Sequence, residues 1–175
     1  ARLSTVVLGL GMPRGGSTAV VHSLAAATGL DIGWDCLGPG ETPAYWHAVS
    51  ARPDILPAVL DSCYDSLWQF PIAKDPVLTP HAGELRQLLP HVPQYAVVRD
   101  PVDHVQSILG HLGLSGWERR FSWPWNMPRA SIWSLGWAEV LNGSWARPVD
   151  DGDYMESILL AFERSLEALV ASEAV

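Results

Sequence analysis

The chain has 175 residues, of which 48% are hydrophobic and 17% are charged. This composition is typical of a packed globular protein, and the length allows one domain with a real core but not two of ordinary size. The 19 acidic and 11 basic residues give a formal net charge of −8, which argues against a nucleic-acid-binding protein and against a polybasic membrane-surface protein. Two cysteines, Cys36 and Cys63, are too few for a disulfide framework or a cysteine-rich zinc site.

No apolar run approaches the ~20 residues that a membrane-spanning helix needs. The N-terminal residues do not resemble a secretory signal, because their apolar stretch is followed at once by a glycine-rich turn. We therefore expect a cytoplasmic protein without a membrane span.

Strand-like and helix-like patterns alternate along the first two thirds of the chain, which predicts an α/β fold with a mostly parallel sheet of three to five strands. The predicted elements are, in chain order, a strand over 5–10, a helix over 17–27 that ends at Gly29, a loop over 31–43, helical pieces around 44–50 and 54–67, a strand over 67–73, a helix over 80–89, a strand over 94–98 and a helix that begins at Asp100-Pro101.

The last third of the chain has a different character. Residues 115–148 contain six tryptophans and several prolines, and this pattern predicts a loop with one helix near 130–141. These tryptophans either cover the sheet, which we favour, or stack on a ligand ring. Apolar residues at helical spacing predict an amphipathic helix from Tyr154 to Ala171. We expect a single domain over 1–175, with 1–112 as a cofactor-binding core and 113–175 as the tryptophan-rich region and C-terminal helix.

The segment Gly11–Thr18 lies between a predicted strand and a predicted helix and has the composition of an anion site. Its glycines let backbone N–H groups approach an anion, and the helix N-terminus adds about half a positive charge. Arg14 adds a cation, and hydroxyls follow at Ser17 and Thr18. Because Ser17 stands where an ATP-binding loop needs lysine, an ordinary nucleotide hydrolase is disfavoured. The alternative is a tight turn without a ligand.

A second candidate site begins at Arg99, at the carboxyl end of a predicted strand, where open α/β sheets bind ligands. Ser107 lies about two turns into the next helix, ~9–10 Å along its axis. An arginine beside that helix could share one phosphate with the serine hydroxyl. The alternative is a surface pair between Arg99 and a neighbouring aspartate.

Together the two motifs resemble the sulfotransferases that use 3′-phosphoadenosine 5′-phosphosulfate (PAPS). The family's Pro-Lys/Arg-Ser-Gly-Thr-Thr type of loop is similar to Pro13-Arg14-Gly15-Gly16-Ser17-Thr18, and its Arg-x-Pro-x-Asp-x-x-x-Ser motif matches Arg99, Pro101, Asp103 and Ser107. The resemblance covers roughly residues 4–110. It implies a P-loop-like three-layer α/β/α fold, with the residues from Arg14 to Thr18 on the 5′-phosphosulfate and with Arg99 and Ser107 on the 3′-phosphate.

Lys74 is the only lysine of the chain and lies between the two motifs. Lys74-Asp75-Pro76 looks like the Lys-x-Pro segment of many sulfotransferases, and the resemblance places this lysine at the reacting sulfuryl group. The alternative is a solvated lysine at the end of a strand. With a net charge of −8, the site must concentrate Arg14, Lys74 and Arg99 at one edge of the sheet to attract a polyanion.

The resemblance implies transfer of a sulfuryl group from PAPS to a hydroxyl or amine of a small-molecule or carbohydrate acceptor, with adenosine 3′,5′-bisphosphate as the product and no metal. Arg14 and Lys74 are the candidate catalytic cations. For the general base, Glu41 is preferred over His47 and Asp75. The other histidines considered lack the spacing of a metal site and are interpreted as structural: His22, His104 and His111.

Two other functions remain open. The first is a degenerate P-loop kinase or nucleotide-binding protein with Arg14 in place of the usual lysine, which would need Asp75 or Asp100 as a Mg²⁺ ligand. The second is a non-catalytic sulfotransferase-like binding module, which a chain shorter than most of the family favours. We expect no nucleic-acid partner, and an incompletely covered sheet favours self-association.

Overall fold

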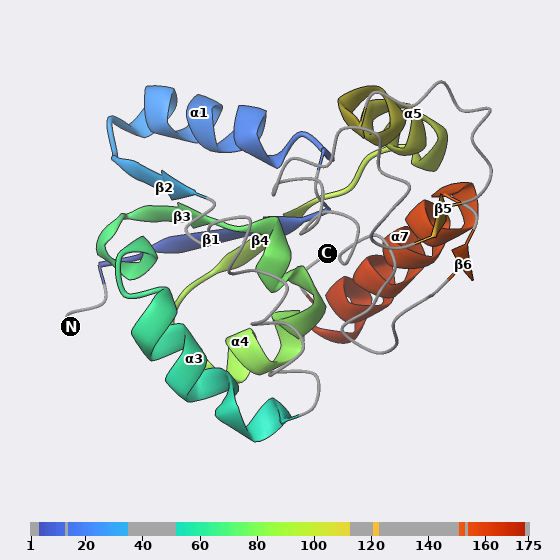
Figure 1. Ribbon diagram of the computed structural model, residues 1–175. Coiled ribbons are helices and arrows are strands. Elements are labelled where there is room, and N and C mark those ends of the chain that lie inside the picture. The colour runs from blue at the N-terminus through green and yellow to red at the C-terminus, as the bar shows by residue number, and fades with distance from the viewer. Residues whose placement is uncertain are drawn as a thin grey trace. The chain divides into compact units, whose positions relative to one another are not determined.

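A four-stranded parallel sheet is the central feature of the computed structural model (Figure 1). Its strands are β1 (Val7–Gly11), β2 (Ile32–Trp34), β3 (Ile72–Lys74) and β4 (Gln94–Val97), in the order β2-β3-β1-β4. After β1 the chain passes to β2 and β3, which both lie on one side of β1. From β3 it then passes to β4 on the other side of β1. The connections therefore diverge next to β1, which is where open α/β sheets bind ligands beyond their carboxyl ends.

The structure describes residues 4–12, 14–34, 52–112, 121–122, 151–152 and 154–173. They belong to two compact units, the first formed by Ala1–Leu37, Leu56–Arg99 and Ser165–Val175 and the second by Gly38–Ile55 and Asp100–Arg164. The whole parallel sheet belongs to the first unit.

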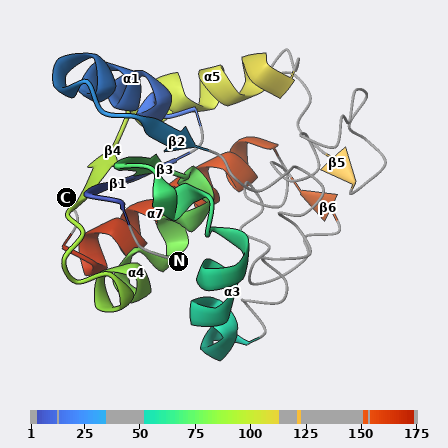
Figure 2. The same ribbon diagram turned by 90° about the vertical axis from the view of Figure 1, so that its left-hand side faces the viewer.

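Helices cover both faces of this sheet. Helix α1 (Ser17–Thr28) lies on one face, and α3 (Leu56–Cys63) and α4 (Ala82–Leu88) lie on the other, as Figures 1 and 2 show from two directions. The predicted α/β class, the three-layer arrangement and the sheet of three to five strands are thereby confirmed.

The remaining described elements are short turns, one strand pair and two longer helices. They are the 3-10 turns η1 (Pro53–Ile55), η2 (Leu67–Gln69) and η3 (Pro76–His81), the helices α5 (Pro101–Leu112) and α7 (Tyr154–Ala171), and the antiparallel pair β5 (Phe121–Ser122) and β6 (Asp151–Gly152). No helix in the described ranges is both long enough and apolar enough to cross a bilayer.

The strand register assigns side chains to the two faces of the sheet. Lys74 pairs with Gly9 in β1 and with Trp34 in β2, and Gly9 pairs with Tyr95 in β4. Paired residues point to the same face, and the Lys74 side chain reaches α1, so this row lies under α1. The alternate residues of β1, such as Leu8, which is fully buried, point toward α3 and α4.

Most predicted elements of the first unit are present, and two predictions are wrong. Residues 67–69 form the 3-10 turn η2 instead of the start of a strand. Leu67 and Trp68 are both buried, and a helical turn can bury two consecutive side chains that a one-sided strand would separate. Residues 32–34, predicted as loop, form the edge strand β2, whose pairing with β3 depends on a distant segment of the chain.

His81 makes the stability of the first unit depend on pH. Its side chain is 13% exposed, and burial lowers the pKa of the ring, an effect that Glu84 partly opposes, with 4.0 Å between His81 Nδ1 and Glu84 Oε1. The unfolded chain, in which histidine titrates near pH ~6.5, therefore binds this proton at a higher pH than the folded chain does. We expect the free energy of unfolding to decrease as the pH falls from about 7 toward 5.

The measurement is the melting temperature across this pH range for the wild type and for His81→Asn. The variant should lose less stability on acidification than the wild type does. The matched control is His91→Asn at an exposed position, which should leave the wild-type slope unchanged. Equal slopes for His81→Asn and the wild type would assign the acid sensitivity to other groups.

Candidate active site

The turn between β1 and α1 presents backbone donors at the carboxyl end of the sheet. Gly16 is the N-cap of α1 with φ 100° and ψ 4°, a left-handed conformation that favours glycine, and no side chain caps the helix there. Arg14 also has a positive φ of 62°, and the Gly15 amide donates to the Met12 carbonyl at 2.9 Å. An uncapped first turn leaves N–H groups that an anion can bind.

The space next to Gly16 is open on the side where a Cβ would stand. Apart from the chain immediately next to Gly16, a Cβ built on this residue meets no heavy atom of the described residues within 4 Å. Ser17, the first residue of α1, is 3% exposed, whereas Thr18 is exposed. The first turn of α1 thus offers both backbone and hydroxyl groups near open space.

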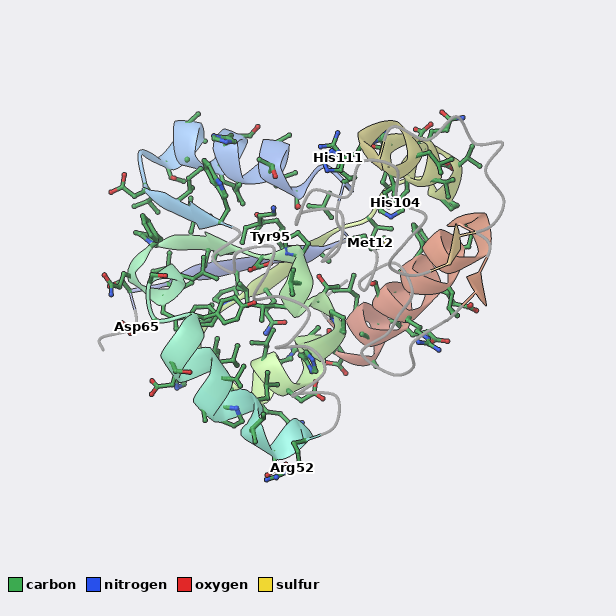
Figure 3. All side chains as sticks on the ribbon, viewed as in Figure 1. Met12, Arg52, Asp65, Tyr95, His104 and His111 are labelled. Carbon is green, nitrogen blue, oxygen red and sulfur yellow. The ribbon has the colours of Figure 1, made fainter. Side chains whose placement is uncertain are left out.

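Thr79, in η3, holds the end of β1 through its side chain. Its hydroxyl donates to the Gly11 carbonyl at 2.7 Å and accepts from the Gly11 amide at 2.9 Å, and its side chain is buried. Met12, which follows in the chain and is labelled in Figure 3, is 1% exposed. The strand end from which the turn starts is therefore held by a side chain of η3.

Replacement of Thr79 by Val keeps the shape of this side chain and removes both hydrogen bonds to Gly11. Because these groups are buried, we expect the free energy of unfolding to fall by about 1–3 kcal/mol, measured by urea denaturation. Thr79→Ser keeps the hydroxyl and is the matched control, with a smaller loss. If Val is as stable as Ser at this position, the hydroxyl does not anchor the turn.

Lys74 contributes its ammonium group to the first turn of α1. It is the last residue of β3 and is 2% exposed, and its Nζ donates to Thr18 Oγ1 at 3.2 Å. The structure therefore contradicts the alternative of a solvated lysine at a strand end. Its ammonium group thus lies beside the uncapped N-terminus of α1, and the two together concentrate positive charge at this edge.

Arg99 brings a second cation to the same turn. It follows β4, and its Nη1 donates to the Arg14 carbonyl across a long contact of 3.5 Å. Both residues are exposed. The carboxyl ends of β1, β3 and β4 thus lie at one edge of the sheet, where two contacts bring together Arg14, Thr18, Lys74 and Arg99.

Two aromatic features beside this edge were missed from the sequence. The hydroxyl of Tyr95 lies over Gly9, and burial raises the pKa of Tyr95 to about 12, so this phenol stays protonated (Figure 3). Trp34, at the end of β2, is 41% exposed, and its ring lies 4.8 Å from that of His22 on α1, centroid to centroid. Only the strand register places these rings in the row of Lys74, so no local pattern could have identified them.

The other predicted site residues lie elsewhere or outside the described residues. Glu41 and His47 belong to the latter group. Ser107 is half-buried on α5, in the second unit. In the same unit, buried His104 packs edge-on against Phe162 with 5.5 Å between the ring centroids.

The aspartates considered as magnesium ligands cap helical segments. Asp75 Oδ1 accepts from the Val77 amide at 2.9 Å at the start of η3, and Asp75 is 1% exposed. Asp100 Oδ1 accepts from the Val102 amide at 2.9 Å and from the Asp103 amide at 3.2 Å at the start of α5. Each carboxylate thus satisfies backbone donors at a helix start.

Comparisons of this chain with protein-family models, with curated proteins and with solved structures find no match.

Proposed function

We propose that this protein is a sulfotransferase that moves a sulfuryl group from PAPS to a hydroxyl or amine of a small-molecule or carbohydrate acceptor. The observation that carries the proposal is the meeting of Lys74 Nζ with Thr18 Oγ1 at the uncapped N-terminus of α1, with the Arg99 guanidinium on the same turn. This edge has cationic and backbone donors from three separate segments, the donor set that a ligand with two separate phosphate groups needs.

The residues would divide the ligand between them. The backbone from Gly15 to Thr18, together with Lys74 and the Arg14 side chain, would hold the 5′-phosphosulfate, and Arg99 would hold the 3′-phosphate. The bound donor supplies the sulfuryl group and leaves as adenosine 3′,5′-bisphosphate.

The chain's own groups act mainly through charge and position. Lys74 is fixed by burial and by Thr18, so its positive charge needs little rearrangement to stabilise negative charge that develops on neighbouring oxygens. Removal of one such preorganised donor typically costs about 10²–10³ in rate. Glu41 remains our candidate for accepting the proton of the acceptor.

A magnesium-dependent nucleotide hydrolase or kinase fits these residues less well. Both aspartates that could bind the metal, Asp75 and Asp100, already accept hydrogen bonds from helix N-termini. An ATP-binding loop also needs a lysine directly after its last glycine, and in this chain Ser17 occupies that position.

A thermal-shift comparison separates the three functions. Adenosine 3′,5′-bisphosphate at a hundredfold excess over its Kd should stabilise the protein by about 2.7 kcal/mol, and ATP with Mg²⁺ should do less. A larger shift with ATP and Mg²⁺ would favour the kinase class. Stabilisation by neither nucleotide would favour a non-catalytic module and would contradict our proposal.

A further inference from the structure

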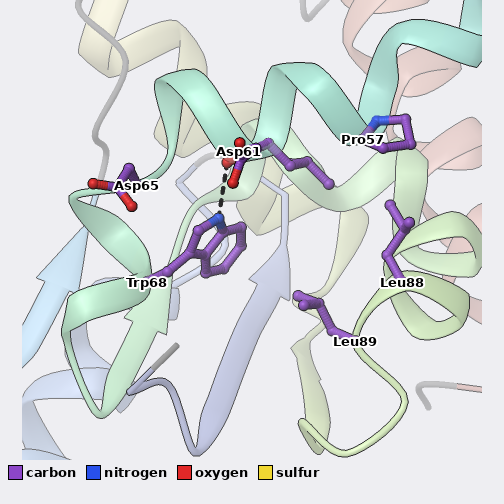
Figure 4. Close-up of a pocket in the computed structure, with 7 residues that line it drawn as sticks. Pro57, Asp61, Asp65, Trp68, Leu88 and Leu89 are labelled. Carbon is purple, nitrogen blue, oxygen red and sulfur yellow. Dashed lines mark hydrogen bonds between the residues drawn. The ribbon is translucent and has the colours of Figure 1, made fainter. Parts of the chain in front are cut away.

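A pocket of about 240 Å³ lies on the α3 and α4 side of the sheet, within the first unit (Figure 4). Its apolar wall is formed by Leu60, Trp68, Leu88 and Leu89, and two carboxylates line it, Asp61 and Asp65. Among the described residues that line this pocket, none is basic. The pocket is therefore apolar with a negative charge, the opposite of the cationic edge beside α1.

The indole of Trp68 presents its ring rather than its donor to a ligand. Its Nε1 donates to the Leu60 carbonyl at 2.9 Å, a bond drawn in Figure 4, and the side chain is 8% exposed. An indole ring whose N–H is already bonded attracts apolar groups and cations. Across the pocket, Leu88 is 40% exposed, which is apolar surface that a ligand can cover.

The two carboxylates have little internal compensation. Asp65 Oδ2 accepts from Gln69 Nε2 at a long 3.4 Å, and the described part of the chain provides no hydrogen bond or ion pair to the Asp61 side chain. Two negative groups that line one small pocket repel each other and attract a cation.

We propose that this pocket binds a small organic ammonium ion with an apolar body. The apolar part would lie against Trp68 and Leu88, and the ammonium would lie between Asp61 and Asp65. The volume is below the ~300–1,000 Å³ of typical drug-sized pockets, so the ligand has about the size of one ring with a short amine chain. This inference does not rest on the proposed sulfotransferase activity.

Three probes that differ in their head group test the proposal: 2-phenylethylamine, 2-phenylethanol and phenylacetate. Binding is followed by chemical-shift titration of the backbone amides of the ¹⁵N-labelled protein. The amine should bind about three- to tenfold more tightly than the alcohol, phenylacetate should bind weakest, and salt should weaken the amine alone. The shifted amides should cluster at α3, η2 and the end of α4.

The double variant Asp61→Asn/Asp65→Asn should weaken amine binding to the level of the alcohol and leave the Kd of the alcohol unchanged. Asp31→Asn, at an exposed aspartate outside the pocket, is the matched control and should change neither. Saturating adenosine 3′,5′-bisphosphate should also change neither. The proposal is overturned if the amine does not bind, if amine and alcohol bind equally to the wild type, or if the double variant keeps the preference for the amine.

Discussion

Replacement of Lys74 by Met should lower the rate of sulfuryl transfer by about 10²–10³-fold in a chain that remains folded. Lys74 is 2% exposed and its Nζ contacts Thr18, so its ammonium has one fixed position beside the N-terminus of α1. Methionine fills the volume of the lysine stem but has no charge and no donor. The measurement is the rate of release of adenosine 3′,5′-bisphosphate from PAPS at a fixed acceptor concentration.

The matched control for this substitution is Arg52→Ala. Arg52 is an exposed cation paired with Asp54 at 2.7 Å, far along the chain from the site motifs, and its loss should leave the rate unchanged. The melting temperature of Lys74→Met verifies that the variant is folded. A folded Lys74→Met protein whose rate falls less than about threefold would remove Lys74 from the reaction, since one lost donor costs far more.

Replacement of Arg99 by Ala should raise the Kd for adenosine 3′,5′-bisphosphate by about ten- to hundredfold. Hydrogen bonds to charged groups contribute about 1.5–3 kcal/mol, and the exposure of Arg99 places the effect toward the lower end. Isothermal titration calorimetry gives the value directly. Arg99 is exposed and outside the buried core, so the fold should persist.

Arg99→Lys refines this experiment, because lysine keeps the charge and loses the planar fork of donors. We expect it to recover part of the affinity that Ala loses. If Ala and the wild type bind the bisphosphate equally well, the 3′-phosphate does not lie at Arg99.

The fold around the site could be predicted where local chemistry determines it. A glycine-rich turn between an apolar run and a run of helix formers predicts a strand, a loop and a helix, and α1 ends at Gly29, whose φ is 71°. The edge strand β2 could not be predicted in this way, because its three residues are extended only through their pairing with β3, a distant segment of the chain. Residues 67–69 are predicted as strand because their apolar composition fits a strand and a helical turn equally well. The burial of the adjacent residues Leu67 and Trp68 favours the helical turn η2.

Only some members of the candidate site, and none of their contacts, could be predicted from the sequence. The motifs identified Arg14, Lys74 and Arg99 by residue type and spacing. The burial of Lys74 depends on its register opposite Gly9, which allows the side chain to pass under α1 to Thr18. Thr79 has no signal at all in the sequence, since its hydroxyl acts on a backbone 68 positions away.

The most direct test of the account compares adenosine 3′-phosphate with adenosine 5′-phosphate on the wild type, Lys74→Met and Arg99→Ala by calorimetry. If Lys74 and Arg99 bind opposite ends of one nucleotide, Arg99→Ala weakens the binding of adenosine 3′-phosphate and leaves the binding of adenosine 5′-phosphate unchanged. Lys74→Met then weakens the binding of adenosine 5′-phosphate and leaves the binding of adenosine 3′-phosphate unchanged. A wild type that binds neither nucleotide, or two variants that weaken the same monophosphate, would contradict the account.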